Sequence, residues 1–539
     1  MTARRGDRGR ESIAAAQAGV PSKQRLLVGV GLAGLVTLAV LLRLVPTVFV
    51  PSLNWGDEVF QTVEPAHRLV YGYGLVTWEF QLGLRSWLLP GALAGVIEVA
   101  RALGDGPEYY LLTIAIALGL LASAPLVCVF GWCRREFGGL AVAFVAAASV
   151  AVGPELVYFG ARALNEVVAA HLLVVALYLS DRSGRTAARQ RRDDIAAGAL
   201  LGIVSLLRLQ LAPAAAVIAL WPGQGNRRAW RVRFSAMLAG GVAALALGAV
   251  LDWLTLGYPL ASVWRNVYYN LYLGVSSGFS VEPWFYYLAG ELGVWGAAAP
   301  FVLLLIGLGA RRFPLLLATA VVLVAVHSLI PHKEYRFVYP AVLLLMLLAA
   351  IGLAQLARWG EKWLRERGLR SPQVAVAAPA LLLLAVWCAT AYGAWSSGTL
   401  AALRQRAHNE LVAMSSARDL PTLCGVGLYG RNAWVRYGGY TYLHRPLPMF
   451  WPDSAAALTA AAPAFNTLLY DSQERGLPPP PTSLGYEPVR CFGSICVARR
   501  SGGCEAQTPP AMWFPPELHG MEPPANRFPA VPPRPNGGR

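Results

Sequence analysis

The stretch FPLLLATAVVLVAVHSLIPHKEYRFVYPAVLLLMLLAA, residues 313–350, places a charged hexapeptide between two long apolar runs. A run of about 20 apolar residues is long enough to cross a hydrocarbon core of about 30 Å. Ionisable side chains near lipid are costly, so they are usually held at the end of a helix bundle or in a water-filled site that uses them. The hexapeptide, residues 332–337, therefore predicts a membrane-embedded helical fold with a polar site at one end of its helices.

The composition extends this prediction to most of the chain. Of its 539 residues, 56% are hydrophobic and 14% are charged, whereas soluble domains carry about 25% charged residues. We therefore predict an all-α polytopic membrane protein with about 11 membrane segments. The apolar runs lie near 25–48, 108–131, 138–154, 164–180, 195–207, 209–222, 234–251, 291–310, 313–331, 337–357 and 373–395.

The positive charge orients these segments. The net charge of +16 comes from short Lys and Arg tracts between the apolar runs, as in cytoplasmic loops under the positive-inside rule, and this argues against nucleic-acid binding. With the N-terminus in the cytoplasm, the loops 51–107 and 252–290, the turn at Arg162 and the segment 332–336 share the opposite face. We expect a bacterial inner membrane or endoplasmic reticulum protein with its site on the periplasmic or luminal side.

The chain divides into four parts. Residues 1–24 form a cytoplasmic tail, 25–396 a transmembrane catalytic domain, 397–505 a small soluble α/β domain, and 506–539 a Pro-rich disordered tail. We expect strands near 424–429 and 465–470. Cys424, Cys491, Cys496 and Cys504 cluster in the soluble part, so one or two disulfides are expected there, with their connectivity open.

Asp57 and Glu58 follow the first apolar run directly. Adjacent acids can divide labour, one acting as a general base and the other orienting the substrate. The alternative is a solvated turn after a helix. We place both residues among the candidate catalytic groups.

Further polar and aromatic residues on the same face are candidate substrate contacts. Carboxylates beside aromatic rings suit a sugar, which offers an apolar face and hydroxyl edges. An interfacial aromatic belt and helix capping are the alternatives. The candidates are Glu64, His67, Trp78, Glu79, Arg162, Asn165, Glu166, Glu282, Trp284 and Tyr287.

Four cationic residues are candidates for binding a phosphate. Lys333 and Arg336 are spaced three apart, so on a helix they would share a face, and His332 could hydrogen-bond to a leaving oxygen. Arg208 interrupts an apolar stretch between two short runs, which predicts a broken helix pair around a buried arginine. Such an arginine needs an anionic partner, either Glu166 or a phosphate. The alternatives are a charged loop end and a structural ion pair.

The hexapeptide resembles the His-Lys-Glu-Glu/Asp-Arg-Phe signature of glycosyltransferase family 22. This family holds the lipid-phosphate-mannose-dependent mannosyltransferases of N-glycan and GPI-anchor assembly and bacterial relatives. The segment 57–61, with 64–67 and 77–79, is similar to the family's first luminal loop. Here Trp55-Gly56 stands where the family usually has His-Pro, and Tyr335 stands where it has an acid, which indicates a divergent, bacterial member.

The resemblance implies a GT-C fold and an inverting transfer of a sugar, mannose in the best-known members. The donor would be a polyprenyl-phosphate sugar and the acceptor a glycan or glycolipid. Asp57 would be the base, and Arg336, Lys333, Arg208 and His332 would bind the leaving phosphate. The resemblance implies no tightly bound cofactor, although a divalent metal at Asp57 and Glu58 stays open.

Three alternatives stay open. A transporter or lipid flippase would show paired broken helices in two related halves, and the sequence has one such pair. A GT-C enzyme could use another sugar or a protein acceptor. A membrane scaffold could bind partners through its C-terminal part.

Overall fold

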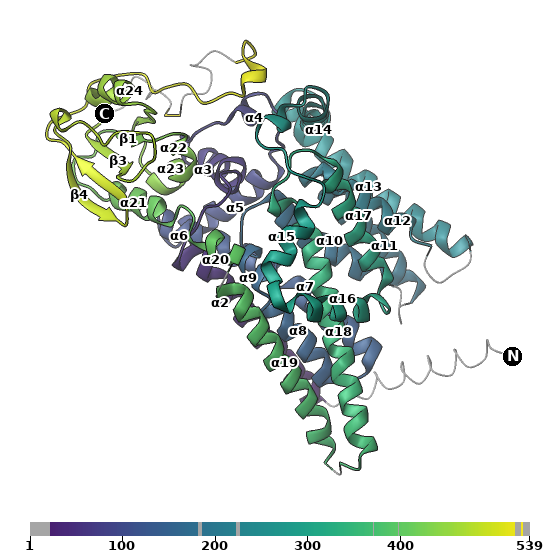
Figure 1. The fold of residues 1–539 in the computed structure, drawn as a ribbon. Coiled ribbons are helices and arrows are strands. Elements are labelled where there is room, and N and C mark those ends of the chain that lie inside the picture. Colours follow the sequence, from purple (N-terminus) through teal and green to yellow (C-terminus); the bar gives the residue numbers. More distant parts are fainter. Residues whose placement is uncertain are drawn as a thin grey trace.

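The computed structural model describes residues 22–181, 186–222, 227–369, 371–396, 398–522 and 530–531. It consists of a helical bundle with a smaller α/β domain packed at one end (Figure 1). Residues 1–21 of the expected N-terminal tail lie outside the described part, as do residues 523–529 and 532–539 of the expected Pro-rich tail.

The bundle begins with α2 and ends with α19. Its helices are α2 (Ser22–Leu44), α3 (Glu64–Tyr71), α4 (Trp78–Gln81), α5 (Leu88–Arg101), α6 (Pro107–Leu121), α7 (Ala124–Phe137), α8 (Leu140–Ala151), α9 (Pro154–Phe159), α10 (Asn165–Ser180), α11 (Ala187–Leu207), α12 (Ala212–Leu220), α13 (Arg227–Leu256), α14 (Ala261–Val267), α15 (Tyr286–Trp295), α16 (Ala299–Ala310), α17 (Pro314–Leu329), α18 (Tyr339–Glu366) and α19 (Pro372–Ser396).

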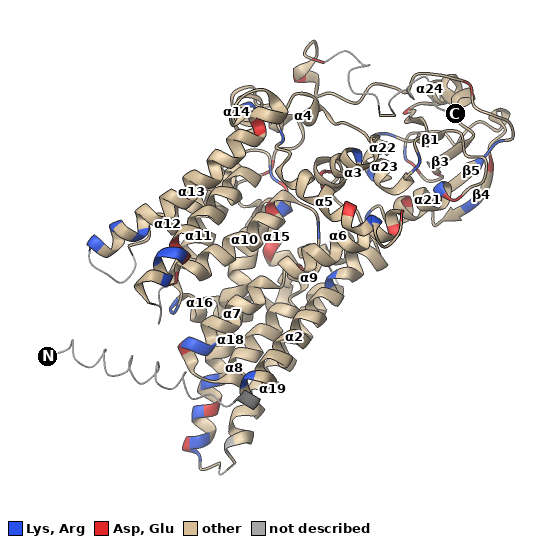
Figure 2. Cartoon of the chain, turned by 180° about the vertical axis from the view of Figure 1, so that it is seen from behind, with Lys and Arg blue, Asp and Glu red and all other residues tan. Residues whose placement is uncertain are grey.

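Six helical stretches among the described residues are long and apolar enough to cross a membrane. They are Gln24–Phe49, Pro107–Phe137, Arg227–Leu256, Tyr286–Ala310, Tyr335–Glu366 and Gln373–Ser396. Shorter apolar helices, including Leu140–Ala151, Asn165–Ser180 and Pro314–Leu329, lie among them. The prediction of a multi-pass helical membrane protein is confirmed, while the number of 11 segments stays a prediction. Lys and Arg gather at the ends of α11, α13 and α18 that lie away from the C-terminal domain (Figure 2).

α18 is the centre of the bundle, because nearly all of its apolar span is buried. It packs against α16 with backbones in contact. A Cβ at Gly352 would meet the Leu305 carbonyl at 2.0 Å, and one at Gly309 would meet the Leu348 carbonyl at 2.0 Å. Glycines allow this approach, as they often do between membrane helices. The 3-10 turn η7 (Tyr335–Val338), which carries the end of the hexapeptide, leads directly into α18 and is fixed by it.

The helix break predicted at Arg208 is confirmed. α11 ends at Leu207, Arg208 is extended with φ −149° and ψ 103°, and η3 (Leu209–Leu211) leads into α12. The break leaves the arginine at a helix end with its side chain free to face a cavity.

The C-terminal domain has a five-stranded sheet in the order β2-β1-β3-β5-β4. The parallel strands β1 and β3 overlap the two predicted segments, and β4 and β5 form an antiparallel hairpin. Disulfides join Cys424 to Cys504 and Cys491 to Cys496, as the cysteine cluster predicted. The helices and strands of the C-terminal domain are α20 (Gly398–Gln405), α21 (His408–Arg418), β1 (Val426–Tyr429), α22 (Ala433–Arg436), α23 (Gly439–Leu443), β2 (Met449–Phe450), α24 (Ala455–Ala461), β3 (Thr467–Asp471), β4 (Glu487–Phe492) and β5 (Ile495–Arg499).

After the last strand the chain returns to the bundle. Disorder is predicted for 506–539, yet residues 505–522, here called the strap, follow an extended path that ends in the short turn η10 (Pro516–Leu518). In Figure 1 this yellow segment passes from the domain to the region of α4. Phe514 and Leu518 of the strap are buried.

Candidate active site

Arg336 gathers the acids of three separate segments. Its Nη1 donates to Glu166 at 3.0 Å, its Nε donates to Glu334 at 2.6 Å, and its Nη2 donates to Asp57. The guanidinium is 3% exposed, while the Asp57 side chain is 32% exposed. Two of these segments lie far apart in sequence, so the predicted meeting of Asp57 with the hexapeptide is present in the structure. Arg336 fixes the direction of the Asp57 carboxylate, part of which stays open to solvent.

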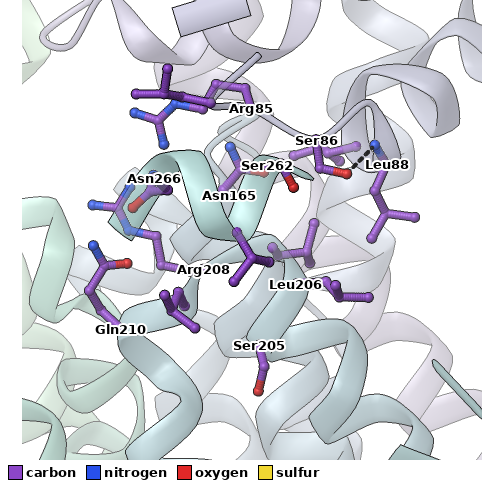
Figure 3. A pocket seen from close by; sticks show the side chains of 15 residues that line it. Arg85, Ser86, Leu88, Asn165, Ser205, Leu206, Arg208, Gln210, Ser262 and Asn266 are labelled. Atoms are coloured by element: carbon purple, nitrogen blue, oxygen red, sulfur yellow. Dashed lines mark hydrogen bonds between the residues drawn. The ribbon is translucent and has the colours of Figure 1, made fainter. Parts of the chain in front are cut away.

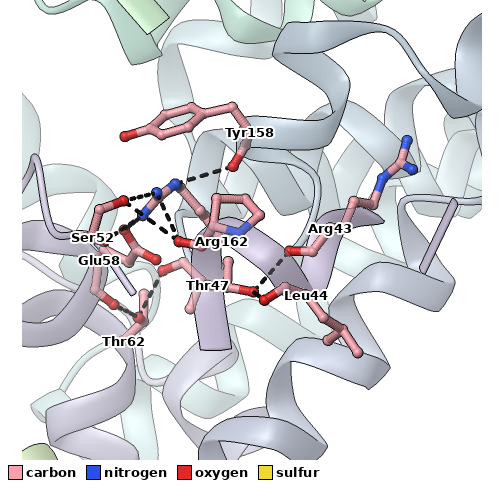
Figure 4. A network of polar contacts seen from close by, with 10 residues as sticks. Arg43, Leu44, Thr47, Ser52, Glu58, Thr62, Tyr158 and Arg162 are labelled. Atoms are coloured by element: carbon pink, nitrogen blue, oxygen red, sulfur yellow. Dashed lines mark hydrogen bonds and ion pairs between the residues drawn. The ribbon is translucent and has the colours of Figure 1, made fainter. Parts of the chain in front are cut away.

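Glu58 binds a different arginine, Arg162 (Figure 4). Arg162, which is fully buried, donates to it at 2.7 Å and also donates to the Ser52 backbone and hydroxyl oxygens. Burial raises the pKa of the Glu58 carboxyl, and the charge of Arg162 opposes that rise. The Glu58–Arg162 pair therefore fixes the turn that precedes α3 and presents Asp57.

His332 and Lys333 do not face a free space. The three protons of the Lys333 ammonium match three backbone carbonyls, those of Glu282 at 2.8 Å, Ile330 at 2.7 Å and Pro331 at 3.4 Å. In this structure the donors of Lys333 hold the hexapeptide against the loop before α15, and its expected contact with a phosphate stays a prediction. His332 Nε2 lies 3.2 Å from Glu334. Burial alone would raise the pKa of the Glu334 carboxyl, but Arg336 and His332 lower it below its usual value.

Arg208 lines a pocket together with Arg85. The lining includes the amides of Asn165, Gln210 and Asn266 and contains no acidic side chain. Figure 3 shows both guanidinium groups directed to the same side of this pocket, with Gln210 and Asn266 beside Arg208. Arg208 Nε has no hydrogen-bond partner within the described part of the chain. Two cations and several amides in a pocket without acids form a site for an anion.

This pocket, here called the arginine pocket, adjoins Asp57. Asn165 lines it, and the next residue, Glu166, binds Arg336. The guanidinium carbons of Arg208 and Arg336 lie 4.4 Å and 4.9 Å from the centre of the same Phe337 ring. Arg208, which lines the pocket, and Arg336, which binds Asp57, therefore pack on the same aromatic ring.

Glu79 connects the two sides of the site. It accepts a hydrogen bond from Gln61 at 2.9 Å and lies 3.6 Å from Arg85. Burial raises the pKa of Glu79, with Arg85 opposing the rise and Asp57 adding to it. Glu79 thus positions Arg85 from within the same loop.

Glu64 and His67 lie at the interface with the C-terminal domain. Glu64 is fully buried and accepts hydrogen bonds from the backbone of Leu75, Tyr440 and Thr441 and from the Thr441 hydroxyl, at 2.6 to 3.1 Å. His67 Nε2 lies 3.1 Å from His444 Nδ1, and its pKa is lowered to about 3 by burial and by His444. Both residues dock the C-terminal domain on the bundle, and the substrate contacts expected for them stay a prediction.

The remaining candidates are dispersed. Trp78 is buried against the strap, and Trp284 is 68% exposed on the outer surface. Glu282 offers its backbone carbonyl to Lys333, and Tyr287 is buried with its hydroxyl unpaired among the described residues. None of the four completes the arginine pocket. The part of the chain that the structure describes holds no group of three His, Cys, Asp or Glu suited to a metal ion.

The amides Gln61, Gln210 and Asn266 are not among the candidates predicted from the sequence, and neither is Arg85. Neutral amides have no distinctive sequence pattern. Arg85 could be found as a cation of the loop 51–107, which the predicted topology places on the same face as Asp57. Tyr335, which replaces the family's acid, places its hydroxyl between Glu155 and Glu291.

Comparison with solved structures shows the class of fold. The chain is similar to ArnT from Cupriavidus metallidurans bound to undecaprenyl phosphate, with a TM-score of 0.55, 14% identity, and coverage of 88% of this chain and 99% of that one. The apo form of the same protein gives a TM-score of 0.56. The protein is a polytopic membrane protein of the GT-C fold.

Sequence comparison gives the family. A model of the Alg9-like mannosyltransferase family matches residues 35–444, and the chain belongs to that family. GPI mannosyltransferase 3 of Yarrowia lipolytica is 31% identical over 312 residues, which cover 57% of this chain and 60% of that protein. The human GPI alpha-1,2-mannosyltransferase 3 is 24% identical over 324 residues, covering 59% of this chain and 56% of that one. The chain thus spans less than two thirds of these relatives.

Proposed function

We propose that the protein transfers mannose, with inversion, from a polyprenyl-phosphate donor to a hydroxyl of a glycan or glycolipid. One observation carries the proposal: Asp57, paired with Arg336, lies beside a pocket with two arginines and no acid. A base next to an anion site is what a sugar phosphate needs when an acceptor hydroxyl displaces its phosphate.

Asp57 is the proposed general base. As the acceptor oxygen attacks the anomeric carbon, Asp57 takes the hydroxyl proton, and the bond from that carbon to the phosphate oxygen breaks. Base catalysis of this kind contributes about 10²- to 10⁴-fold. The ion pair with Arg336 fixes the direction of the carboxylate, which limits the number of unproductive orientations.

Arg85 and Arg208 are the proposed ligands of the leaving phosphate. Negative charge grows on that group as the bond breaks, and fixed cations in a largely buried site stabilise it. The leaving group needs little protonation, so a single carboxylate suffices, in contrast to the two carboxylates of glycoside hydrolysis. Of the residues expected to bind the phosphate, this assignment keeps Arg208. It leaves out Lys333 and Arg336 and adds Arg85.

The site is proposed to face the periplasm or the lumen. The Lys- and Arg-rich helix ends lie away from the C-terminal domain (Figure 2), and the positive-inside rule places such ends in the cytoplasm. The two disulfides belong to an oxidising compartment, in agreement with this orientation. The shorter apolar helices would complete the 11 membrane segments.

The comparisons support the substrate classes. The relatives are named GPI mannosyltransferases, which suggests mannose and a glycolipid acceptor. The structural neighbour was solved with undecaprenyl phosphate, which suggests the same type of lipid phosphate here.

The test is transfer by the purified protein from a panel of polyprenyl-phosphate sugars to glycolipid acceptors, followed by mass analysis. We expect mannose transfer by the wild type and a loss of at least about 10²-fold in kcat for Asp57→Asn. Asp453→Asn changes an exposed carboxylate of the C-terminal domain and serves as the matched control. Full turnover by Asp57→Asn would refute the base, and transfer of another sugar in place of mannose would refute the donor.

A further inference from the structure

The strap begins at a fixed point of the C-terminal domain. It leaves directly after Cys504, which is disulfide-bonded to Cys424, and the Glu505 amide donates to the Pro463 carbonyl at 2.9 Å. From there it runs to the bundle above α4 (Figure 1). A covalently closed domain thus sends one segment across to the loops of the candidate active site.

The strap is anchored there by buried apolar side chains. Leu518 is fully buried and Phe514 is 7% exposed, and both belong to one cluster with Trp78, Leu84 and Val275. Burying a Leu or Phe side chain contributes about 1.5–3 kcal/mol, which favours this position of the segment. The cluster joins the loop 78–88 to the loop 273–281.

Two more contacts extend this attachment. The ring of Trp513 lies 5.7 Å from that of Phe279. Glu517 lies against Gly278, where a Cβ would approach its carboxylate oxygen to 2.7 Å. The strap therefore packs against the backbone of the loop 273–281 as well as against its side chains.

Leu84 links the strap to the arginine pocket. It is 3% exposed, it packs in the strap cluster, and it also lines the pocket immediately before Arg85. On the other side of the same turn, Gly83 lies against Arg265 of α14, where a Cβ would meet its Nη1 at 2.0 Å. The turn that carries Arg85 is thus held between α14 and the strap.

We propose that Phe514 and Leu518 of the strap are positioning residues for Arg85, so that the C-terminal domain determines how tightly the arginine pocket binds the lipid phosphate. The inference rests on the proposed function for the identity of that anion. Without the strap, Leu84 loses its outer packing, the turn 83–85 relaxes, and the guanidinium of Arg85 no longer points into the pocket.

The test is equilibrium binding of a short-chain polyprenyl phosphate in detergent micelles, combined with a double-mutant cycle. We expect Phe514→Ala/Leu518→Ala to raise Kd about 10-fold, and to raise it less than about 2-fold in an Arg85→Ala background. His519→Ala, an exposed change in the same strap, should leave Kd unchanged. Phe514→Leu, which keeps an apolar side chain, should keep most of the wild-type affinity. If the double variant does not fold, Leu518→Ala alone takes its place in the cycle and should raise Kd in the same direction.

The outcomes separate the two proposals. Equal affinity of wild type and strap variants, or the same loss in both backgrounds, would overturn the positioning role. A wild type that does not bind polyprenyl phosphate would overturn it as well. A wild type that binds the lipid phosphate but transfers no sugar would refute the proposed function while the positioning role is still measured by binding.

Discussion

At the scale of single residues, the site is built from charges whose partners differ in kind. Arg336 is surrounded by three carboxylates, whereas Arg208 packs on Phe337 and faces the arginine pocket. A cation already neutralised by acids holds those acids in place. A cation beside neutral amides is available for a ligand. This difference assigns Arg336 to the base and Arg208 to the phosphate.

Arg208→Ala should therefore raise the KM for the donor about 10- to 100-fold, since a charge-assisted hydrogen bond to a buried anion is worth about 1.5–3 kcal/mol. The KM for the acceptor should stay within about 2-fold. Initial rates at varied donor and acceptor measure both constants. A larger effect on the acceptor would show that the phosphate lies elsewhere.

Arg162→Ala should destabilise the protein. It leaves Glu58 buried without its counter-charge, which typically costs about 3–5 kcal/mol. The double variant Arg162→Ala/Glu58→Gln should recover part of that loss, because the uncompensated charge is gone. Thermal unfolding in detergent gives the comparison, and equal stability of the single variant and the wild type would contradict the role of the pair.

The sequence predicted the residues of this site better than their partners. The proximity of Asp57 to the hexapeptide followed from topology, because alternate loops share a membrane face. The binding of Lys333 to carbonyls could not be predicted, because it depends on how the loop before α15 folds back. The contacts of Glu64 and His67 could not be predicted for the same reason. Their partners Thr441 and His444 belong to the C-terminal domain, 377 residues later in the chain.

At the scale of elements, α18 carries the site because it is rigid and central. The first turn of α18 follows η7, which carries Arg336. The close packing of α18 on α16 at their glycines fixes the position of α18 along its axis. The helix break at Arg208 supplies the opposite wall. Both elements were predicted from hydrophobic runs and their interruption, while the close α16–α18 contact was not, because a glycine in an apolar run has no distinct pattern.

Gly352→Ala should destabilise the protein and lower its activity. The new Cβ would meet the Leu305 carbonyl at 2.0 Å, and overpacking of this kind costs about 1–3 kcal/mol. Gly307→Ala on α16 is the matched control, because nothing lies within 4 Å of its Cβ position. Thermal unfolding and initial rates of the two variants test this, and equal behaviour would contradict the tight contact.

At the scale of the whole molecule, the C-terminal domain contacts the segment 56–64 from outside the bundle. Glu64 binds the backbone of α23, Phe60 packs edge-on against Trp434 at 4.9 Å, and Gly56 lies against Val435. The segment that carries Asp57 is therefore clamped between membrane helices and the domain. A soluble α/β domain was predicted, but not that it completes the site.

The docking of the domain should weaken in acid. The pKa of His67 is lowered to about 3 by burial and by His444, while an exposed histidine titrates near about 6.5. The undocked state therefore binds more protons between these values, so stability is full above about pH 6.5 and falls as the pH drops towards 3. Burial raises the pKa of Glu64, which acts in the opposite sense, so the comparison needs a variant.

Hydrogen exchange of residues 433–444 at pH 5 and pH 7 measures this effect. The wild type should lose on the order of 1–2 kcal/mol of protection at pH 5, and His67→Gln should lose less. His519→Gln, exposed in the strap, is the control. The same pH dependence in His67→Gln and wild type would show that another group is responsible.

The order in which this molecule is synthesised gives the strap a further consequence. Asp57 emerges early from the ribosome, but the surfaces that hold it and the segment proposed to aim Arg85 are translated several hundred residues later. Nascent chains should therefore stay inactive through almost all of translation. We expect activity to appear only when the strap has been made and Cys504 has paired with Cys424.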